Sequence, residues 1–234
     1  MKKILLLLIC LTTLESCNQI IEERVITLND DEKNLAITTL QLYQNKNSLN
    51  MVHLDSVVNY GVDLIKENKG KELANLLDKE LSNFYASPSN TIDNEIKLHK
   101  LICALYYKQT TYEILISKSI SLNEHTVMHI ESQGSNHPEY AEILEDLLTY
   151  RIIKEDDKSI MKNYSKAILA GRKLSTHALQ TDNKDAQIYS SLLLAYLYEM
   201  NDAHELKDSC INSIKHIIPL YPESEERAWQ FLNR

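Results

Sequence analysis

Apolar residues recur along this 234-residue chain at the three- and four-residue intervals of an α-helix, and no stretch alternates apolar and polar residues as a half-buried strand does. Only four glycines and four prolines interrupt the pattern. The sequence therefore predicts an all-α fold. We expect about ten helices, joined by short polar loops, over residues 31–46, 51–67, 71–86, 92–109, 111–124, 138–154, 158–180, 184–200, 203–219 and 223–232.

The beginning of the chain has the pattern of an export signal. Lys2 and Lys3 precede an apolar run over residues 4–11. A helix over residues 4–14 would be about 16 Å long, whereas the hydrocarbon core of a bilayer is roughly 30 Å thick. We therefore expect export of the chain and no permanent membrane-spanning helix in this segment.

The segment LESC at residues 14–17 resembles the bacterial lipobox, with a leucine three places before the cysteine and a small residue directly before it. The resemblance implies a signal peptide over residues 1–16, a lipid on Cys17 and a tether over residues 17–30. Several acyl chains would anchor the chain stably, because each buried methylene contributes about 0.8 kcal/mol. We expect a lipid-anchored protein of the bacterial cell envelope, at the outer membrane on its periplasmic or surface face. An ordinary secretory signal cut nearby is the alternative.

Charge and composition argue against several classes of function. A formal net charge of −8 argues against a nucleic-acid partner and against adhesion to anionic lipid headgroups. The scattered glycines leave no phosphate-binding loop, and no nucleophile elbow or Ser/His/Asp group is recognisable. We therefore expect no enzyme and no cofactor. Cys103 and Cys210 lie in apolar helical stretches and are expected to be free thiols.

One pattern could hold a metal ion. His125 and His129 are four residues apart, beside Glu124 and Glu131, and two imidazoles at that spacing on a helix can bind one ion. The same stretch falls where we expect a loop to begin, after residue 124. A solvated helix end is therefore the favoured interpretation, and we expect no metal.

Two neighbouring segments have the spacing of a helical repeat. Tyr189, Leu192, Leu193 and Tyr196 resemble the first helix of a tetratricopeptide repeat. The preceding segment resembles the second helix of such a repeat, in which a small residue lets two helices approach closely; its matching residues are Tyr164, Ala167, Gly171 and Leu174. The last hairpin has the same intervals, at Cys210, Ile214 and Ile217.

The stretch GSNHPEYAEILEDLL, residues 134–148, resembles the kinesin-light-chain subtype of this repeat, which has a longer loop ending in His-Pro. Pro138 suits a first helical turn, because its missing N–H would be unpaired there. His137 or Asn136 is expected to cap the helix. Gly134 is expected to let the loop reverse direction.

These resemblances imply an α-solenoid of about five antiparallel helical hairpins with a C-terminal capping helix. Residues 31–94 would form N-terminal hairpins of degenerate repeats, residues 95–222 tetratricopeptide-like repeats, and residues 223–234 the cap, with Trp229 as a packing anchor. A generic helical bundle with coincidental spacing is the alternative.

The first helices of such repeats line a concave groove. The residues that we expect to project into this groove are Glu142, Glu145, Thr149, Gln187, Ser190, Leu194 and Tyr198. An acidic groove that also contains tyrosine would suit a helical or extended peptide carrying Lys or Arg. Packing within the chain is an equal alternative for Leu194 and Tyr198.

The sequence thus favours a membrane-anchored helical-repeat scaffold that binds a protein or peptide partner in the bacterial cell envelope. A sensory or regulatory module acting through a signalling partner is one alternative. A glycan-binding envelope lipoprotein, with tyrosines as stacking platforms, is another. The oligomeric state and the identity of the partner do not follow from the sequence.

Overall fold

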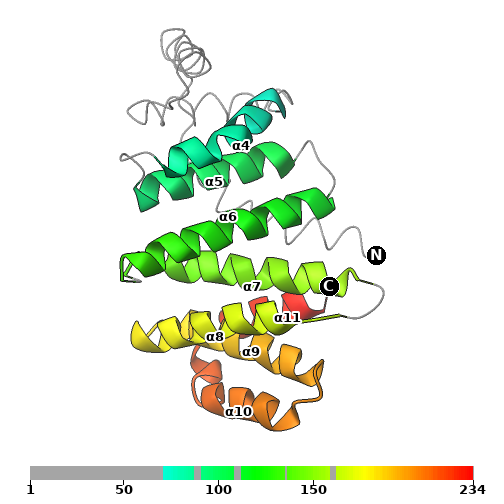
Figure 1. Ribbon diagram of the computed structural model, residues 1–234. Helices are drawn as coiled ribbons and strands as arrows, with labels where there is room; N and C mark the ends of the chain where they lie inside the picture. Colours follow the sequence, from blue (N-terminus) through cyan, green and yellow to red (C-terminus); the bar gives the residue numbers. More distant parts are fainter. Residues whose placement is uncertain (1–70, 87–90, 108–111, 135, 159–161, 234) are drawn as a thin grey trace. The chain divides into compact units, whose positions relative to one another are not determined.

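A computed structural model describes residues 71–86, 91–107, 112–134, 136–158 and 162–233 (Figure 1). Cys17 and the helices expected over residues 31–46 and 51–67 lie outside this part of the chain. The elements, in chain order, are α4 (Lys71–Tyr85), α5 (Ile92–Tyr107), α6 (Tyr112–Ser132), α7 (Tyr140–Asp156), α8 (Ser165–Gln180), α9 (Lys184–Glu199), α10 (His204–Ile214), the 3-10 helix η2 (Ile218–Leu220) and α11 (Pro222–Leu232). Among these described residues there is no strand, which confirms the all-α prediction. None of the described helices has both the length and the apolar character of a membrane span.

The described residues divide into two compact units between Leu122 and Asn123. The first unit contains α4, α5 and the first part of α6. Its described part contains an apolar cluster made by Ala74, Leu77, Leu81, Phe84, Leu98, Leu101, Ile102, Leu105 and Leu122. Beside that cluster, Asp78 of α4 accepts a hydrogen bond from the Tyr106 hydroxyl at 3.2 Å and pairs with Lys118 of α6. These contacts hold the three helices of the first unit together.

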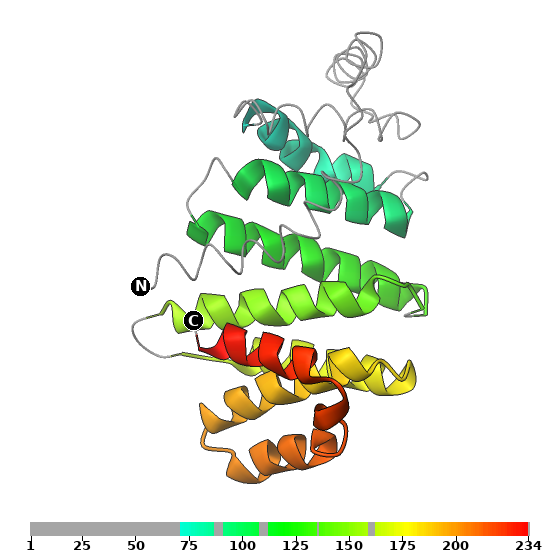
Figure 2. The same cartoon turned by 180° about the vertical axis from the view of Figure 1, so that it is seen from behind.

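The second unit is built around α9. In chain order α7 packs against α8, α8 against α9, and α9 against α10, and α7 also contacts α9 (Figure 1). The C-terminal helix α11 returns to pack along α9, next to α7 (Figure 2). Twelve of the sixteen residues of α9 are therefore buried, which makes it the enclosed central element of this unit.

The close approach of α8 to α9 depends on small residues at the predicted positions. Ala167 and Gly171 are buried on α8. A Cβ added at Gly171 would lie 2.8 Å from Leu194 Cδ2, closer than real Cβ atoms approach a neighbour. The burial predicted for Tyr164, Ala167, Gly171 and Leu174 is therefore confirmed.

Two consecutive helices, α8 and α9, end in the same local structure. Each ends with an aspartate in the left-handed region, Asp182 with φ 55° and Asp202 with φ 54°. The next residue, Asn183 or Ala203, donates its N–H to the carbonyl five residues earlier, at 2.9 and 2.8 Å. This is the Schellman arrangement, usually made with glycine. The unit therefore repeats not only helices but also the way in which they end.

The end of α6 differs from the prediction. We expected a loop to begin after residue 124, but α6 continues to Ser132. The apolar stripe continues through Val127, 3% exposed, and Ile130, 1% exposed, so this stretch gains burial by staying helical. Gly134 then has φ 99°, a left-handed conformation suited to glycine, and the predicted reversal at this position is confirmed.

The start of α7 lies two residues beyond Pro138, at Tyr140. His137 takes part in the preceding turn in two ways. Its carbonyl accepts the N–H of Tyr140 at 3.1 Å, and its ring Nδ1 accepts the N–H of Glu139 at 3.2 Å. The imidazole therefore satisfies a backbone donor ahead of the helix, close to the capping role expected for it.

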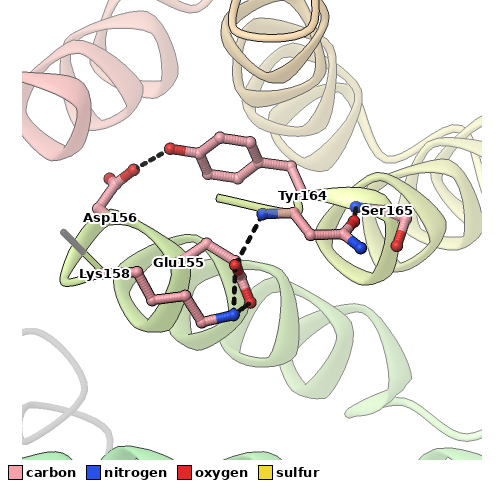
Figure 3. Close-up of polar contacts among 6 residues, drawn as sticks. Glu155, Asp156, Lys158, Tyr164 and Ser165 are labelled. Carbon is pink, nitrogen blue, oxygen red and sulfur yellow. Dashed lines mark hydrogen bonds and ion pairs between the residues drawn. The ribbon is translucent and has the colours of Figure 1, made fainter. Parts of the chain in front are cut away.

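Two other helix bounds also differ from the prediction. α8 begins at Ser165 rather than at residue 158, because Glu155 Oε2 accepts the N–H of Asn163 and Asn163 Oδ1 accepts the N–H of Ser165 (Figure 3). These bonds hold residues 163–165 in a turn. α10 ends at Ile214 rather than at residue 219. Pro219 lies beyond that end, where it cannot donate a helical hydrogen bond.

The buried side of α11 also differs from the prediction. Trp229 is 45% exposed, so its assignment as a packing anchor is wrong. The buried residues are Ser224, Ala228 and Phe231, at intervals of four and three residues. Trp229 lies about 100° around the helix from Ala228 and leaves that stripe. Its indole N–H instead donates to Glu225 Oε1 at 3.2 Å.

Candidate functional site

The most distinctive polar contact in the second unit joins α7 to α11. Arg227 Nη1 donates to Glu145 Oε2 at 2.9 Å, and Arg227 Nη2 donates to Glu145 Oε1 at 3.4 Å. The Glu145 side chain is 18% exposed and that of Arg227 is 47% exposed. Burial raises the pKa of the Glu145 carboxyl above its ordinary value, and the guanidinium only partly offsets that rise. Glu145 is thus a largely buried carboxylate that needs a cation beside it.

The aromatic ring of Tyr189 on α9 packs against the guanidinium of this ion pair. The Arg227 guanidinium lies over the Tyr189 ring, 4.3 Å from its centroid, which is cation–π geometry. The Tyr189 hydroxyl and the Thr149 hydroxyl of α7 are 3.2 Å apart and share a hydrogen bond. Burial raises the pKa of Tyr189 to about 12, so the phenol stays neutral in the physiological range. Three helices therefore contribute to one guanidinium site.

The remaining contacts of α11 extend along the same face. The Ser224 hydroxyl donates to Asp185 in the first turn of α9. Ala228 and Phe231 are buried, at 0% and 4% exposed. α11 therefore lies on the face formed by α7 and α9 with a small polar residue, an arginine, an alanine and a phenylalanine. We call this surface, defined by Glu145, Thr149, Asp185 and Tyr189, the α7–α9 face.

The structure brings together only part of the predicted groove. Glu145 and Thr149 both lie on the α7–α9 face, and Glu142 is half-buried near the start of α7. Gln187 and Ser190 are buried within the unit. The Gln187 amide donates to the Ala178 carbonyl at 2.9 Å, and the Ser190 hydroxyl donates to the Gln187 carbonyl at 3.3 Å. These two side chains thus serve local hydrogen bonding, and binding by them stays a prediction.

Leu194 and Tyr198 pack within the chain, which was one of the two interpretations left open for them. Leu194 is 4% exposed and lies against Gly171 of α8. Tyr198 is 6% exposed, and its hydroxyl accepts a hydrogen bond from Arg172 Nε at 2.8 Å. Neither side chain offers an exposed contact surface in this structure.

A second polar cluster joins α6, α7 and α8. Glu131 Oε1 accepts from Lys173 Nζ at 2.6 Å and from the Tyr140 hydroxyl at 2.8 Å. Burial alone would raise the pKa of Glu131, but these two hydrogen bonds and the lysine charge lower it overall. The Tyr140 ring also lies edge-on to His177, with centroids 4.8 Å apart. Every member has a partner on a neighbouring helix, so this cluster serves packing.

A third cluster anchors the connection between α7 and α8 (Figure 3). The Tyr164 ring points towards Asp156, and its hydroxyl donates to Asp156 Oδ1 at 2.5 Å. The Tyr196 hydroxyl of α9 donates to the same oxygen at 3.3 Å. Glu155 pairs with Lys158 at 2.7 Å. Tyr164 and Tyr196 thus share one carboxylate at the end of α7, which ties α7, α8 and α9 together.

The structure shows where the two histidines considered as metal ligands and the two cysteines lie. His125 and His129 lie on α6, not in a loop, and His129 Nε2 is 3.0 Å from the Gln133 amide nitrogen. Within the described ranges, no group of three or more His, Cys, Asp or Glu side chains could hold a metal ion. Neither Cys103 nor Cys210 forms a disulfide, as predicted.

Sequence reasoning missed Arg227, Ser224 and Asp185 as members of the site. Arg227 lies in the segment expected to form a capping helix, and 82 positions separate it from Glu145. The sequence feature that could have indicated Arg227 is the apolar stripe of α11. Arg227 lies at the edge of that stripe, one residue before Ala228. Comparison of the chain with protein-family models, with curated proteins and with solved structures finds no match to any of them.

Proposed function

We propose that this chain is a non-catalytic, membrane-anchored helical-repeat scaffold that binds a protein or peptide partner in the bacterial cell envelope. In this proposal the chain is an α-solenoid of about five antiparallel tetratricopeptide-like hairpins, anchored by a lipid on Cys17. The successive packing of α7, α8, α9 and α10 supports it. The matching helix ends at Asp182 and Asp202 also support it, because two consecutive helices end in the same local structure.

One observation carries the binding part of the proposal: the α7–α9 face already holds a helix. Glu145, on one of the expected groove helices, receives the guanidinium of α11. An acidic, tyrosine-bearing groove was expected to suit a peptide carrying Lys or Arg. The chemistry of the face and the chemistry of the segment lying on it therefore agree.

The physical basis of that recognition is an arginine held by two different groups. A bidentate guanidinium–carboxylate pair is stronger than a pair of neutral hydrogen bonds, and it fixes orientation. The Tyr189 ring adds cation–π attraction from below. Glycan binding is less well supported, because Tyr198, the tyrosine among the expected groove residues, is buried and accepts a hydrogen bond from Arg172.

Site-specific photocrosslinking in the producing cells tests this function. A photoreactive amino acid at position 142, on α7 near Glu145, is expected to capture a protein partner. The matched control is position 169 on α8, where Leu169 is 58% exposed, and it is expected to capture none. Loss of the adduct in Glu145→Lys would tie the capture to the face. Equal capture from both positions would refute binding through this surface.

The anchor is tested separately by the intact mass of the chain extracted from membranes. The expected mass is that of residues 17–234 plus a lipid, and Cys17→Ala should lose the lipid and leave the membrane fraction. A chain cut elsewhere, with no added mass, would show an ordinary secretory signal instead.

A further inference from the structure

We propose that α11 is an internal occupant of the α7–α9 face and that the partner is an amphipathic helix presenting the same residue pattern, which binds by displacing α11. The pattern is a small polar residue, arginine three places later, alanine directly after it and an aromatic residue three places further, as in Ser224, Arg227, Ala228 and Phe231. This inference rests on the proposed function, since it names the partner class of the same face.

The way in which α11 is held makes it detachable. Only three of its residues are buried, and Glu223, Glu226, Trp229 and Gln230 on its other side are exposed. A helix held by one narrow stripe opens more easily than one enclosed by neighbours, as α9 is. α11 therefore has fewer buried residues to lose on release than α7, α8 or α9.

The connection to α11 also favours release without wider unfolding. η2 buries none of its residues, Leu220 is 72% exposed and Tyr221 is 36% exposed. α10 packs on α9 independently of α11. Pro219 and Pro222 stiffen the connection and limit the conformations open to it. α11 can thus leave while α7 to α10 keep their contacts.

The face left behind would select its next occupant by charge and shape. Glu145 would remain a largely desolvated carboxylate and Tyr189 an uncovered ring. Arginine satisfies both groups at once, whereas lysine offers one compact charge without the planar fork. Phe231 is 4% exposed, so the apolar surface that it covers favours an aromatic residue on the next turn of the incoming helix. The required chemistry is therefore an arginine-bearing amphipathic helix.

Competition from α11 has a quantitative consequence. A segment joined by a short connection competes at an effective concentration in the millimolar range. The apparent affinity of a partner is its intrinsic affinity multiplied by the fraction of chains whose face is free. Weakening α11 should therefore tighten partner binding, although the partner's own contacts are unchanged.

The test uses the full-length chain in detergent and a fluorescein-labelled peptide with the sequence of residues 221–234, in which Trp229 is replaced by Phe. The chain then contains the only tryptophan of the mixture, on α11. Peptide anisotropy reports binding. Acrylamide quenching of Trp229 reports whether α11 is seated. The chains compared are wild type, the double variant Arg227→Ala/Phe231→Ala, and Gln230→Ala on the exposed side of α11 as the matched control.

We expect the double variant to bind the peptide at least tenfold more tightly than wild type, and Gln230→Ala to bind it like wild type. Excess peptide should raise the quenching of Trp229 in the wild-type chain. A peptide with Lys in place of Arg should bind the double variant at least tenfold more weakly than the arginine peptide.

Failures of the two proposals are distinguishable. Equal peptide affinity in wild type and the double variant would overturn occlusion by α11 and leave the crosslinking test of the function untouched. Release of α11 with no peptide binding to any chain would show that the α7–α9 face does not take such a helix, and would overturn both this inference and the proposed binding face.

Discussion

Gly171→Ala should not stabilise the chain, although alanine is the better helix former. Within a helix this replacement usually gains about 1 kcal/mol. Here the added Cβ would lie 2.8 Å from Leu194 Cδ2, 3.0 Å from Leu194 Cγ and 3.4 Å from Leu148 Cδ1. Leu194 is 4% exposed and Leu148 is fully buried, so neither side chain can move into open space. Overpacking of this kind costs about 1–3 kcal/mol, which leaves a net loss of about 0–2 kcal/mol.

A double-mutant cycle isolates the contact behind this loss. Leu194→Ala alone should cost about 2–5 kcal/mol, because it leaves a cavity between α8 and α9. In that background the new Cβ at position 171 no longer meets the leucine. Gly171→Ala should then show its ordinary gain of about 1 kcal/mol. The expected coupling energy between the two positions is therefore about 1–3 kcal/mol, favourable in the double variant.

Urea unfolding followed by far-UV circular dichroism measures the four chains of the cycle, and comparable m-values make their free energies of unfolding comparable. A second cycle with Leu179→Ala is the matched control, since Leu179 lies on the same helix and is 66% exposed. That cycle should show no coupling. If Gly171→Ala stabilises the chain by about 1 kcal/mol equally in the wild-type and Leu194→Ala backgrounds, the close approach of α8 to α9 is wrong.

Three further predictions concern charge and backbone conformation. Lys173→Ala should cost at most about 1 kcal/mol at neutral pH, because the pair with Glu131 is about one-third exposed. Since the pKa of Glu131 is lowered in the folded chain, that cost should be present above the ordinary carboxyl pKa and vanish as the pH falls through the lowered pKa, which urea unfolding at several pH values checks. Arg227→Ala should raise the pKa of Glu145 further, because burial remains and the guanidinium is lost; the cost of the variant should therefore grow as the pH rises through that pKa, and carboxyl-carbon NMR would follow the titration. Asp202→Gly should raise the free energy of unfolding by up to about 1 kcal/mol, because glycine adopts a φ of 54° without strain, and a thermal melt that shows a loss instead would contradict this.

The sequence was informative where the spacing of residues a few positions apart determines which side of a helix is buried. Leu144, Leu148 and Leu193 lie at helical intervals in the segments that resemble repeat helices, and all three are fully buried. Gly171 was expected at a close helix crossing, and the structure places it against Leu194. Which side of a helix is buried depends on residues one or two turns apart on that helix, and periodicity records this directly.

The parts that the sequence did not reveal depend on distant neighbours. Periodicity identifies the apolar side of α11 only approximately, and it says nothing of which helix that side will contact. The pairing of Glu145 with Arg227 spans 82 positions and leaves no local pattern. For the same reason Gln187 and Ser190 read as groove residues, although they lie buried inside the unit. A polar side chain facing a covered helix looks, in sequence, like one facing water.

The enclosure of α9 has a consequence for how the chain is made. Synthesis proceeds from the N-terminus, so α9 emerges before α10 and α11, the helices that cover two of its sides. Until those last residues are synthesised, the apolar surface of α9 that they later cover is exposed. It can then bind other nascent chains and chaperones. A messenger truncated shortly after the codon for Met200 would leave that surface uncovered permanently, and its product would be a substrate for quality-control proteases.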